Sequence, residues 1–181
     1  MPRIPVHDVA SAPEQSRDEL TALEARFGKV LGIHGHMAHA PVVLRSYVAL
    51  QQVIADHGTY DAATREAVAL VVADVDRCSY CAAAHTAGAT RAGLSEADTV
   101  AIRAGRYDAD PRLAALLALV RESVSHLGTV QDETWQSALD AGWSDAELTE
   151  ASVHIALNLF TNHVNHLVET ELDLPAAPPR D

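Results

Sequence analysis

The sequence predicts an all-α protein with a single domain of about eight helices. Apolar residues recur at the three- and four-residue spacing of amphipathic helices through most of the chain, and no stretch shows the period-two alternation that is typical of a strand. Helix-start and helix-stop residues divide the chain into segments of helical length. With 181 residues, 48% of them hydrophobic, the chain is long enough to bury one substantial core.

The first four helices are predicted from this apolar periodicity. Their expected ranges are Asp18–Phe27, Pro41–Ala55, Ala62–Val75 and Ser79–Ala92. The stretch HGHMAH, with His34, His36 and His39, lies just before a helix that starts with proline. We expect this stretch to be a polar loop that holds no metal ion.

Capping residues mark two of the remaining helices. The stretch SEADTVAIRAG begins with a capping box formed by Ser95 and Asp98 and stops at Gly105. The next helix has Asp110 as its cap and Pro111 at its first position. The last two helices are expected over Gln131–Ala141 and Asp145–Glu171.

The two ends of the chain differ from this helical body. Residues 1–16 contain three prolines and are expected to form an extended N-terminal arm. Residues 175–181 are expected to form a mobile tail, because the final stretch LPAAPPRD is too rich in proline to continue a helix. The predicted helical domain therefore spans residues 17–174.

Composition and charge narrow the class of function. The formal net charge is -12 and there is no basic run, so neither a nucleic-acid partner nor an anionic membrane surface is expected. No apolar stretch reaches the roughly 18 to 20 residues that a membrane span needs. The N-terminal stretch has no apolar core that could serve as a signal peptide. We expect a cytoplasmic protein whose partners are proteins or small molecules.

The only two cysteines lie in the stretch CSYCAAAH, in which Cys78, Cys81 and His85 are spaced i, i+3 and i+7. If a helix begins near Cys78, the three side chains share one narrow stripe of its surface. A thiol at a helix N-terminus faces free backbone N–H groups and the positive end of the helix dipole, and both favour the thiolate. His85 can exchange a proton with the sulfur one turn away. The pattern indicates a redox dithiol that closes an internal disulfide, which partner thiols then reduce.

Two other interpretations of this stretch remain open. The two cysteines and His85 offer three ligands for a metal ion, but no second CxxC or HxxxH supplies the distant pair that structural zinc sites use, so neither a metal nor a cofactor is expected. The other alternative is a pair of inert buried thiols. A CxxC pair in a reducing compartment is more often catalytic or metal-binding than structural.

A polar stripe runs along the last predicted helix. Asn158, Asn162, Asn165 and Glu169 follow the spacing i, i+4, i+7 and i+11, which places them on one helix face. Such regularity on an apolar helix indicates a face that lines a cleft or a subunit contact. A solvated or internally hydrogen-bonded face is the alternative. Asn162 and Asn165 are candidates for an auxiliary role at the site.

The stretch REAVALVVADVDRCSYCAAAHTAGATRAG resembles the core motif of the AhpD-like alkylhydroperoxidases of the carboxymuconolactone decarboxylase family. That motif is a glutamate, eleven residues and then CxxCxxxH, and it is met here by Glu66, Cys78, Cys81 and His85. The final helix also resembles the asparagine-bearing last helix of peroxidase-related members. The resemblance spans residues 40–175 and implies an AhpD-like helical bundle that assembles as a homotrimer or homohexamer.

The resemblance also implies roles for the motif residues. The cysteines cycle between dithiol and disulfide, and Glu66 and His85 form a proton relay. Helix-terminus reasoning favours Cys78 as the attacking thiolate, whereas the family relay favours Cys81 with Cys78 as its exposed partner, and we expect Cys81. Some members carry a histidine where this chain has Tyr80. A tyrosine can hydrogen-bond at the site but is a poor proton carrier near neutral pH, because its ordinary pKa is about 10.

The activity implied by the resemblance is that of a thiol-dependent peroxidase, an oxidoreductase with a hydroperoxide as acceptor. A dithiol donor such as a lipoyl-protein or a thioredoxin would recycle the disulfide. One alternative is the lactone decarboxylase activity that names the wider family, which needs no cysteine pair. The other is a non-enzymatic subunit that senses redox state.

Overall fold

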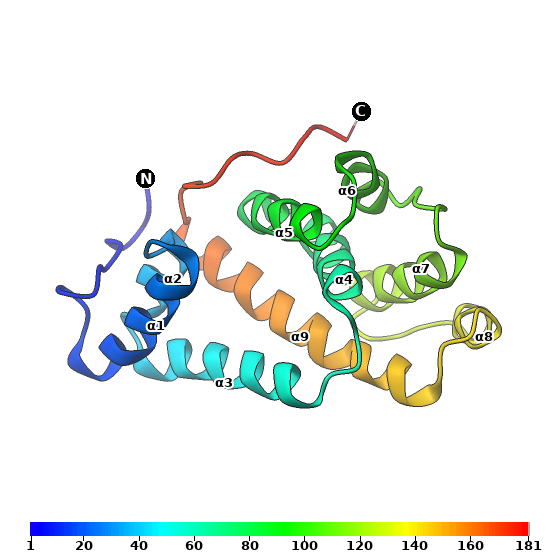
Figure 1. Ribbon diagram of the computed structural model, residues 1–181, viewed down its shortest axis with the longest axis horizontal. Coiled ribbons are helices and arrows are strands. Elements are labelled where there is room, and N and C mark those ends of the chain that lie inside the picture. Colours follow the sequence, from blue (N-terminus) through cyan, green and yellow to red (C-terminus); the bar gives the residue numbers. More distant parts are fainter. Residues whose placement is uncertain (181) are drawn as a thin grey trace.

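The computed structural model describes residues 1–180, and within them the chain forms nine α-helices, one short 3-10 helix and no strand (Figure 1). Eight of the α-helices have seven or more residues, so the all-α prediction of about eight helices is confirmed. The elements are η1 (Glu14–Ser16), α1 (Arg17–Phe27), α2 (Gly32–Met37), α3 (Pro41–His57), α4 (Ala62–Val75), α5 (Ser79–Arg91), α6 (Glu96–Arg103), α7 (Pro111–Ser125), α8 (Asp132–Asp140) and α9 (Asp145–Val168).

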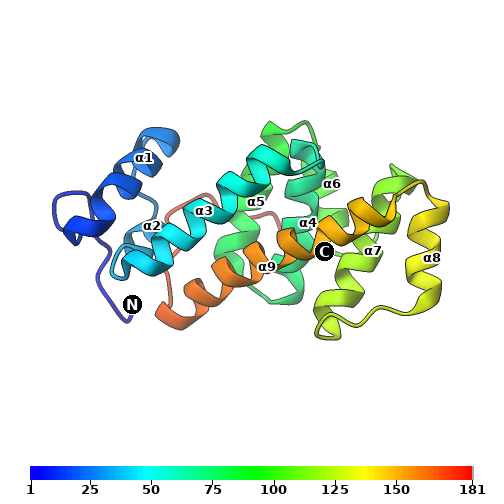
Figure 2. The same ribbon diagram turned by 90° about the horizontal axis from the view of Figure 1, so that it is seen from below.

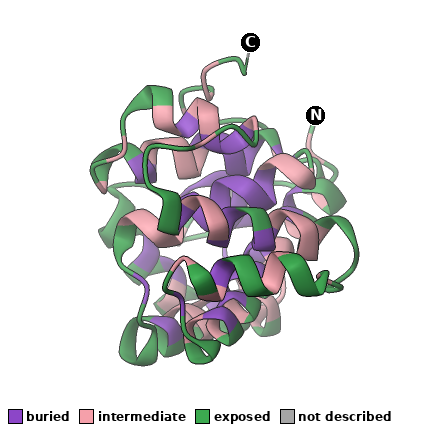
Figure 3. Ribbon diagram, turned by 90° about the vertical axis from the view of Figure 1, so that its right-hand side faces the viewer, coloured by how far each residue is buried: buried purple, intermediate pink, exposed green. Residues whose placement is uncertain are grey.

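Helix α4 lies at the centre of the fold and packs against α5, α6, α7 and α9. Its seven consecutive residues 67–73 are all buried, which is the pattern of a helix covered on every side. Helices α3 and α9 lie side by side along one face of the molecule (Figure 2). Figure 3 shows the buried residues gathered in the interior, with exposed residues on the outer turns and loops.

Two buried clusters make up the core. The first joins α4 and α7 to the start of α9, through residues such as Leu70, Leu116 and Leu148. The second joins α1, α2 and α3 to the start of α5, and it contains both cysteines. The candidate site therefore lies inside the second cluster rather than on a surface loop.

The stretch HGHMAH is not a polar loop, so that prediction was wrong. All six residues of α2, which include His34 and His36, are buried. The N-terminal arm crosses this helix at Gly35, where a Cβ atom would overlap Val6 and the backbone of His7. One ring nitrogen has a tertiary partner, since His36 Nδ1 lies 3.0 Å from the hydroxyl of Thr170, whereas His36 Nε2 and His34 Nδ1 are buried without one. A six-residue helix buried by distant segments leaves little periodic signal in the sequence.

The predicted helix boundaries hold where capping residues mark them. Ser95 and Asp98 form a capping box, and the carboxylate of Asp110 caps the helix that starts at Pro111. The last helix ends at Val168 rather than Glu171, because Glu169 adopts a left-handed conformation with φ 56°. None of the described helices is both long and apolar enough to cross a membrane.

The C-terminal segment runs from the end of α9 past α5 to α6 (Figure 1). The Tyr80 hydroxyl donates to Asp173 at 2.8 Å, and the guanidinium of Arg103 donates to the carbonyl of Pro178. Arg180 pairs with Asp74 of α4. Residue 181, the last of the tail predicted to be mobile, lies outside the described residues, and the mobility of that tail stays a prediction.

Candidate active site

The two cysteines sit where α4 turns into α5. Arg77 takes a left-handed conformation, with φ 55°, and reverses the chain between the two helices. Cys78 is the N-cap of α5, and its sulfur accepts the backbone N–H of Cys81 at 3.3 Å. The prediction that the helix begins near Cys78 is confirmed. The two sulfur atoms lie 2.7 Å apart, and the residues are only 2% and 3% exposed.

This geometry shifts the pKa values of the two thiols in opposite directions. The hydrogen bond between the sulfurs, helped by the N–H of Cys81, lowers the pKa of Cys78 to about 7 although burial opposes the shift. The same hydrogen bond, together with burial, raises the pKa of Cys81 above its ordinary range. One negative charge is therefore shared by the pair near neutral pH, and it resides mainly on Cys78.

We expect this division to appear in a titration of thiolate ultraviolet absorbance. The wild-type protein should gain one thiolate with a midpoint near the pKa of about 7 of Cys78, while the second thiol stays protonated. Cys81→Ala removes the neighbouring thiol and should raise that midpoint towards the ordinary cysteine pKa of about 8.5. A midpoint near 7 that persists in Cys78→Ser would assign the low pKa to Cys81 instead.

The polar stripe of α9 reaches the sulfurs through one residue. Asn165 is buried and its amide nitrogen lies 3.2 Å from the sulfur of Cys81 and 3.9 Å from that of Cys78. Asn158 and Asn165 line a cleft, as the regular spacing predicted. Asn162 does not line it. Its side chain is fully buried and its amide points to the carbonyl of Val72 at 3.5 Å.

Glu66 and His85 form a hydrogen-bonded pair between α4 and α5. His85 Nδ1 lies 2.8 Å from a carboxylate oxygen of Glu66, and both side chains are about one-quarter exposed, at 27% and 29%. The bond on Nδ1 leaves His85 Nε2 free to act towards the cleft. Gly88, three residues beyond His85, makes room for the carboxylate: a Cβ atom there would lie 2.5 Å from the Glu66 side chain.

We expect Gly88→Ala to break the Glu66–His85 pair. The added methyl group must displace the carboxylate, because the three atoms nearest to it all belong to the end of the flexible Glu66 side chain. The expected signs are a lower thermal midpoint and a shifted imidazole NMR signal of His85. Gly93→Ala at the end of the same helix is a control without that clash, since nothing lies within 4 Å of a Cβ atom there, although its φ of 104° makes alanine strained. An unchanged His85 signal in Gly88→Ala would contradict the expected displacement.

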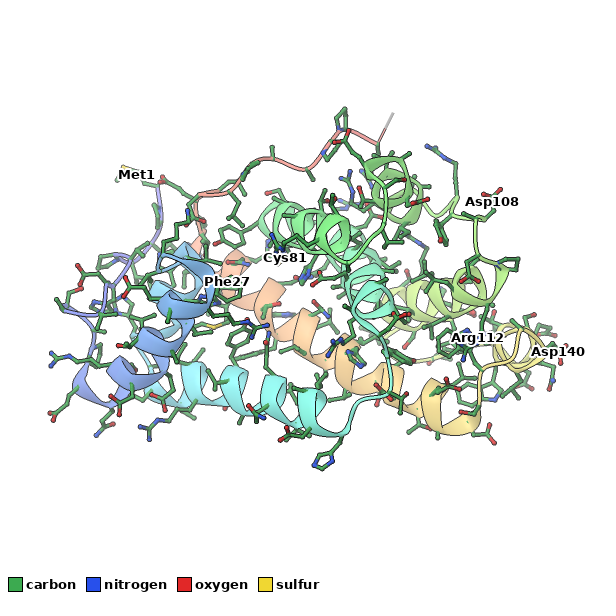
Figure 4. All side chains as sticks on the ribbon, viewed as in Figure 1. Met1, Phe27, Cys81, Asp108, Arg112 and Asp140 are labelled. Atoms are coloured by element: carbon green, nitrogen blue, oxygen red, sulfur yellow. The ribbon has the colours of Figure 1, made fainter. Side chains whose placement is uncertain are left out.

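A cleft of about 500 Å³ opens between the α1–α3 end of the molecule and helices α4, α5 and α9. Cys81, His85 and Glu66 line it, whereas Cys78 does not. Phe27 at the end of α1 and Cys81 on α5 both border the cleft and lie near each other in the view of Figure 4. The expectation that Cys78 is the exposed partner is therefore wrong, because its role as helix cap turns its sulfur inward.

Residues 41–122 match the sequence profile of the carboxymuconolactone decarboxylase family. This stretch of the chain is similar to that family. The matched stretch begins at α3 and ends within α7, so it contains Glu66, both cysteines and His85. No curated protein matches the chain significantly in sequence.

Solved structures share the fold over nearly the whole chain. An alkylhydroperoxidase AhpD core protein, described as peroxidase-related, from Ralstonia eutropha JMP134 superimposes with a TM-score of 0.84 at 18% identity, covering 95% of this chain and 92% of that one. A peroxidase-related protein from Silicibacter sp. TM1040 gives 0.77 at 16% identity, with coverage of 92% and 88%. The apo debrominase Bmp8 gives 0.77 at 18% identity, with coverage of 93% and 90%. At these identities the likeness establishes the AhpD-like fold alone.

Tyr80, which stands between the two cysteines, holds the C-terminal segment. Its hydroxyl donates to Asp173, and that carboxylate also accepts the backbone N–H of Gly32. Burial and the neighbouring carboxylate raise the pKa of Tyr80 well above its ordinary range. The hydroxyl is thus engaged in a structural bond. Sequence reasoning missed Asp173, which lies 93 residues away from Tyr80 in a stretch without a motif.

The described residues offer no candidate metal site. Within residues 1–180, no group of three or more histidine, cysteine, aspartate or glutamate side chains is arranged to hold a metal ion. His163 and His166 on α9 instead contact backbone carbonyls, those of Leu159 and Asp76. Both cysteine sulfurs lie near Asn165, and that of Cys81 also borders the cleft.

Proposed function

We propose that the protein is a thiol-dependent peroxidase that reduces organic hydroperoxides through a disulfide between Cys78 and Cys81. The observation that carries the proposal is the paired thiol geometry. The two sulfurs lie 2.7 Å apart, the pKa of Cys78 is lowered to about 7, and Cys81 borders a cleft that also contains the Glu66–His85 pair. A dithiol with one lowered pKa, next to an acid–base residue, is the arrangement that thiol redox chemistry needs.

The position of each sulfur indicates which step of the reaction it performs. The Cys81 sulfur borders the cleft and that of Cys78 does not, so we propose that Cys81 attacks the terminal oxygen of the hydroperoxide after losing its proton to His85. Access to the cleft decides this order, although the hydrogen bond between the sulfurs and burial raise the pKa of Cys81. The O–O bond breaks, Cys81 becomes a sulfenic acid, and the alkoxide takes a proton from His85 to leave as an alcohol. The thiolate of Cys78 then attacks the Cys81 sulfur and expels hydroxide, which is protonated to water. In total, one hydroperoxide and two thiols give one disulfide, one alcohol and one water.

Two neighbouring groups support this sequence of steps. Glu66 accepts the Nδ1 proton of His85, so Nε2 is the nitrogen that exchanges a proton with the reactants. Asn165 donates a hydrogen bond towards the Cys81 sulfur, which stabilises negative charge on that atom as its proton leaves. Glu66 thus acts on His85, and Asn165 acts on the Cys81 sulfur.

The test is oxidation of the reduced protein by cumene hydroperoxide. Its mass should fall by two hydrogens, and both thiols should be lost together in proportion to the hydroperoxide added. Turnover should then follow when reduced lipoyl-protein or thioredoxin is supplied. Two thiols that persist after exposure to excess hydroperoxide would refute the proposal.

The other activities considered from the sequence give distinct results in the same preparation. A lactone decarboxylase would release carbon dioxide from a muconolactone, with or without its cysteines. A redox-sensing subunit would form the disulfide once without turnover by dithiol donors. A debrominase, an activity that the sequence did not suggest and that is named for the solved structure Bmp8, would release bromide from a brominated pyrrole. No feature of the cleft favours these over peroxide reduction.

The assembly and the electron donor belong to the same proposal. We propose a homotrimer or homohexamer, recycled by a lipoyl-protein or thioredoxin-like dithiol. Apolar side chains that stay exposed on this chain, such as Val42 and Val53 on the outer face of α3, support burial between copies. Light scattering that reports a monomer at micromolar concentration would refute the assembly.

A further inference from the structure

The charged residues that line the cleft are mostly basic, although the chain as a whole is acidic. The whole sequence has 25 acidic residues against 13 lysines and arginines. Among the charged residues that line the cleft, three are arginines, Arg26, Arg65 and Arg91, and the one carboxylate is Glu66. Burial lowers the pKa of His34 to about 4, so this lining histidine adds no charge. The cleft is thus a locally cationic region of an acidic protein.

Two of these arginines are not engaged elsewhere in the protein. Within residues 1–180, neither Arg65 nor Arg91 forms an ion pair or a side-chain hydrogen bond, whereas Arg45, Arg112 and Arg121 pair with carboxylates. Glu66 is already engaged by His85. An unpaired guanidinium at the edge of a cleft presents a planar set of donors that matches a carboxylate.

Apolar side chains form part of the cleft lining. They include Leu23, Phe27, Val48 and Leu157, beside polar ones such as His85. A volume of about 500 Å³ falls within the range of ligand pockets, which is about 300–1,000 Å³. The cleft therefore suits a ligand with an apolar body.

The distance between Cys81 and Arg91 indicates how long such a ligand can be. They lie ten residues apart on α5, so their Cα atoms are about 15 Å apart along the helix. Arg65 comes from the first turn of α4, directly before Glu66. A ligand whose reactive end meets Cys81 can thus present its other end to arginines from two helices.

We propose that the cleft selects an organic hydroperoxide that carries a carboxylate at the far end of an apolar chain, with Arg65 and Arg91 as the residues that recognise the carboxylate. The substrate class named here rests on the peroxidase proposed above. The anion recognition rests only on the charge and shape of the cleft, so the two are tested separately.

The first experiment measures binding without chemistry. Decanoate and decan-1-ol are titrated into the reduced full-length protein by calorimetry, and decanoate should bind at least tenfold tighter. Arg65→Gln and Arg91→Gln should each reduce this preference about tenfold, a typical loss for a charge-assisted hydrogen bond. Added salt should also weaken the binding of decanoate. Equal affinity for the two ligands would overturn the anion site.

Matched variants separate recognition from folding. Arg106→Gln is the control, because Arg106 is exposed, lies outside the cleft and bonds only the carbonyl of Arg180. This variant should keep the full preference for decanoate. Arg65→Lys should restore part of the preference that Arg65→Gln loses. A loss as large in Arg106→Gln as in Arg65→Gln would show a general charge effect and overturn the assignment.

The second experiment compares a fatty-acid hydroperoxide with its methyl ester in turnover with a dithiol donor. The kcat/KM ratio of acid to ester should exceed ten and should fall in Arg65→Gln and Arg91→Gln. Equal kcat/KM for acid and ester would overturn the selection for a carboxylate while the peroxidase stands. Turnover of neither, with the preference for decanoate retained, would refute the peroxidase and support the anion site.

Discussion

Cys81→Ser should reduce hydroperoxide turnover to the uncatalysed rate. The serine hydroxyl fits the space of the thiol but is not ionised near neutral pH. The cleft therefore loses the nucleophilic sulfur that borders it. Cys78→Ser should also stop turnover by dithiol donors, for a different reason. Serine at an N-cap still accepts the backbone N–H that Cys78 accepts, so the helix should keep its cap while the internal disulfide can no longer form.

The two cysteine variants differ in the product that they leave after one exposure to hydroperoxide. Cys78→Ser should become one oxygen heavier, as a sulfenic acid at Cys81 that dimedone traps. Cys81→Ser should keep its mass. Mass spectrometry of both variants, with helical content checked by circular dichroism, decides the order of the thiols. If Cys81→Ser is the variant that forms the sulfenic acid, Cys78 is the attacking residue and the order is reversed.

His85→Gln should slow peroxide reduction by about 10²- to 10⁴-fold near neutral pH, because general acid–base assistance is worth about that much. The glutamine can still hydrogen-bond to Glu66, so the contact between α4 and α5 should survive. The lost function is proton exchange at Nε2. The rate should recover in part as the pH rises, because hydroxide then removes the thiol proton without the imidazole.

Glu66→Gln tests the same relay from its other end. It should act in the same direction as His85→Gln, and the double variant should lose less than the sum of the two effects, because both groups serve one proton path. His57→Gln is the matched control, since His57 is exposed at the end of α3 and lies outside the cleft. Wild-type activity of His85→Gln across pH 6 to 9 would leave the imidazole without a catalytic role.

The short-range features of the fold follow from the sequence. Ser95 and Asp98, and the pair Asp110 and Pro111, mark helix starts that the structure reproduces, because a capping hydrogen bond joins residues only two or three positions apart. The cap at Cys78 is local in the same sense. Even the stripe that brings Asn165 towards the cleft follows from helical periodicity alone.

Other site residues needed more than local pattern. Glu66 lies nineteen positions before His85, and their pairing depends on how closely α5 approaches α4. The family motif predicted that the two act together, whereas Gly88, which permits the approach, carried no signal by itself. Asp173 and its bond to Tyr80 depend on where the C-terminal segment crosses α5.

The sequence by itself determined the described α-helices other than α2, the two caps named above and the spacing of the dithiol, because each depends on residues within a few turns of one another. Tertiary structure alone decided that His34 and His36 lie on a buried helix, that Cys81 rather than Cys78 borders the cleft, and that arginines from α1, α4 and α5 line it. The physical reason is that burial and local charge are properties of the packed chain. They are fixed by segments that meet only when the helices come together.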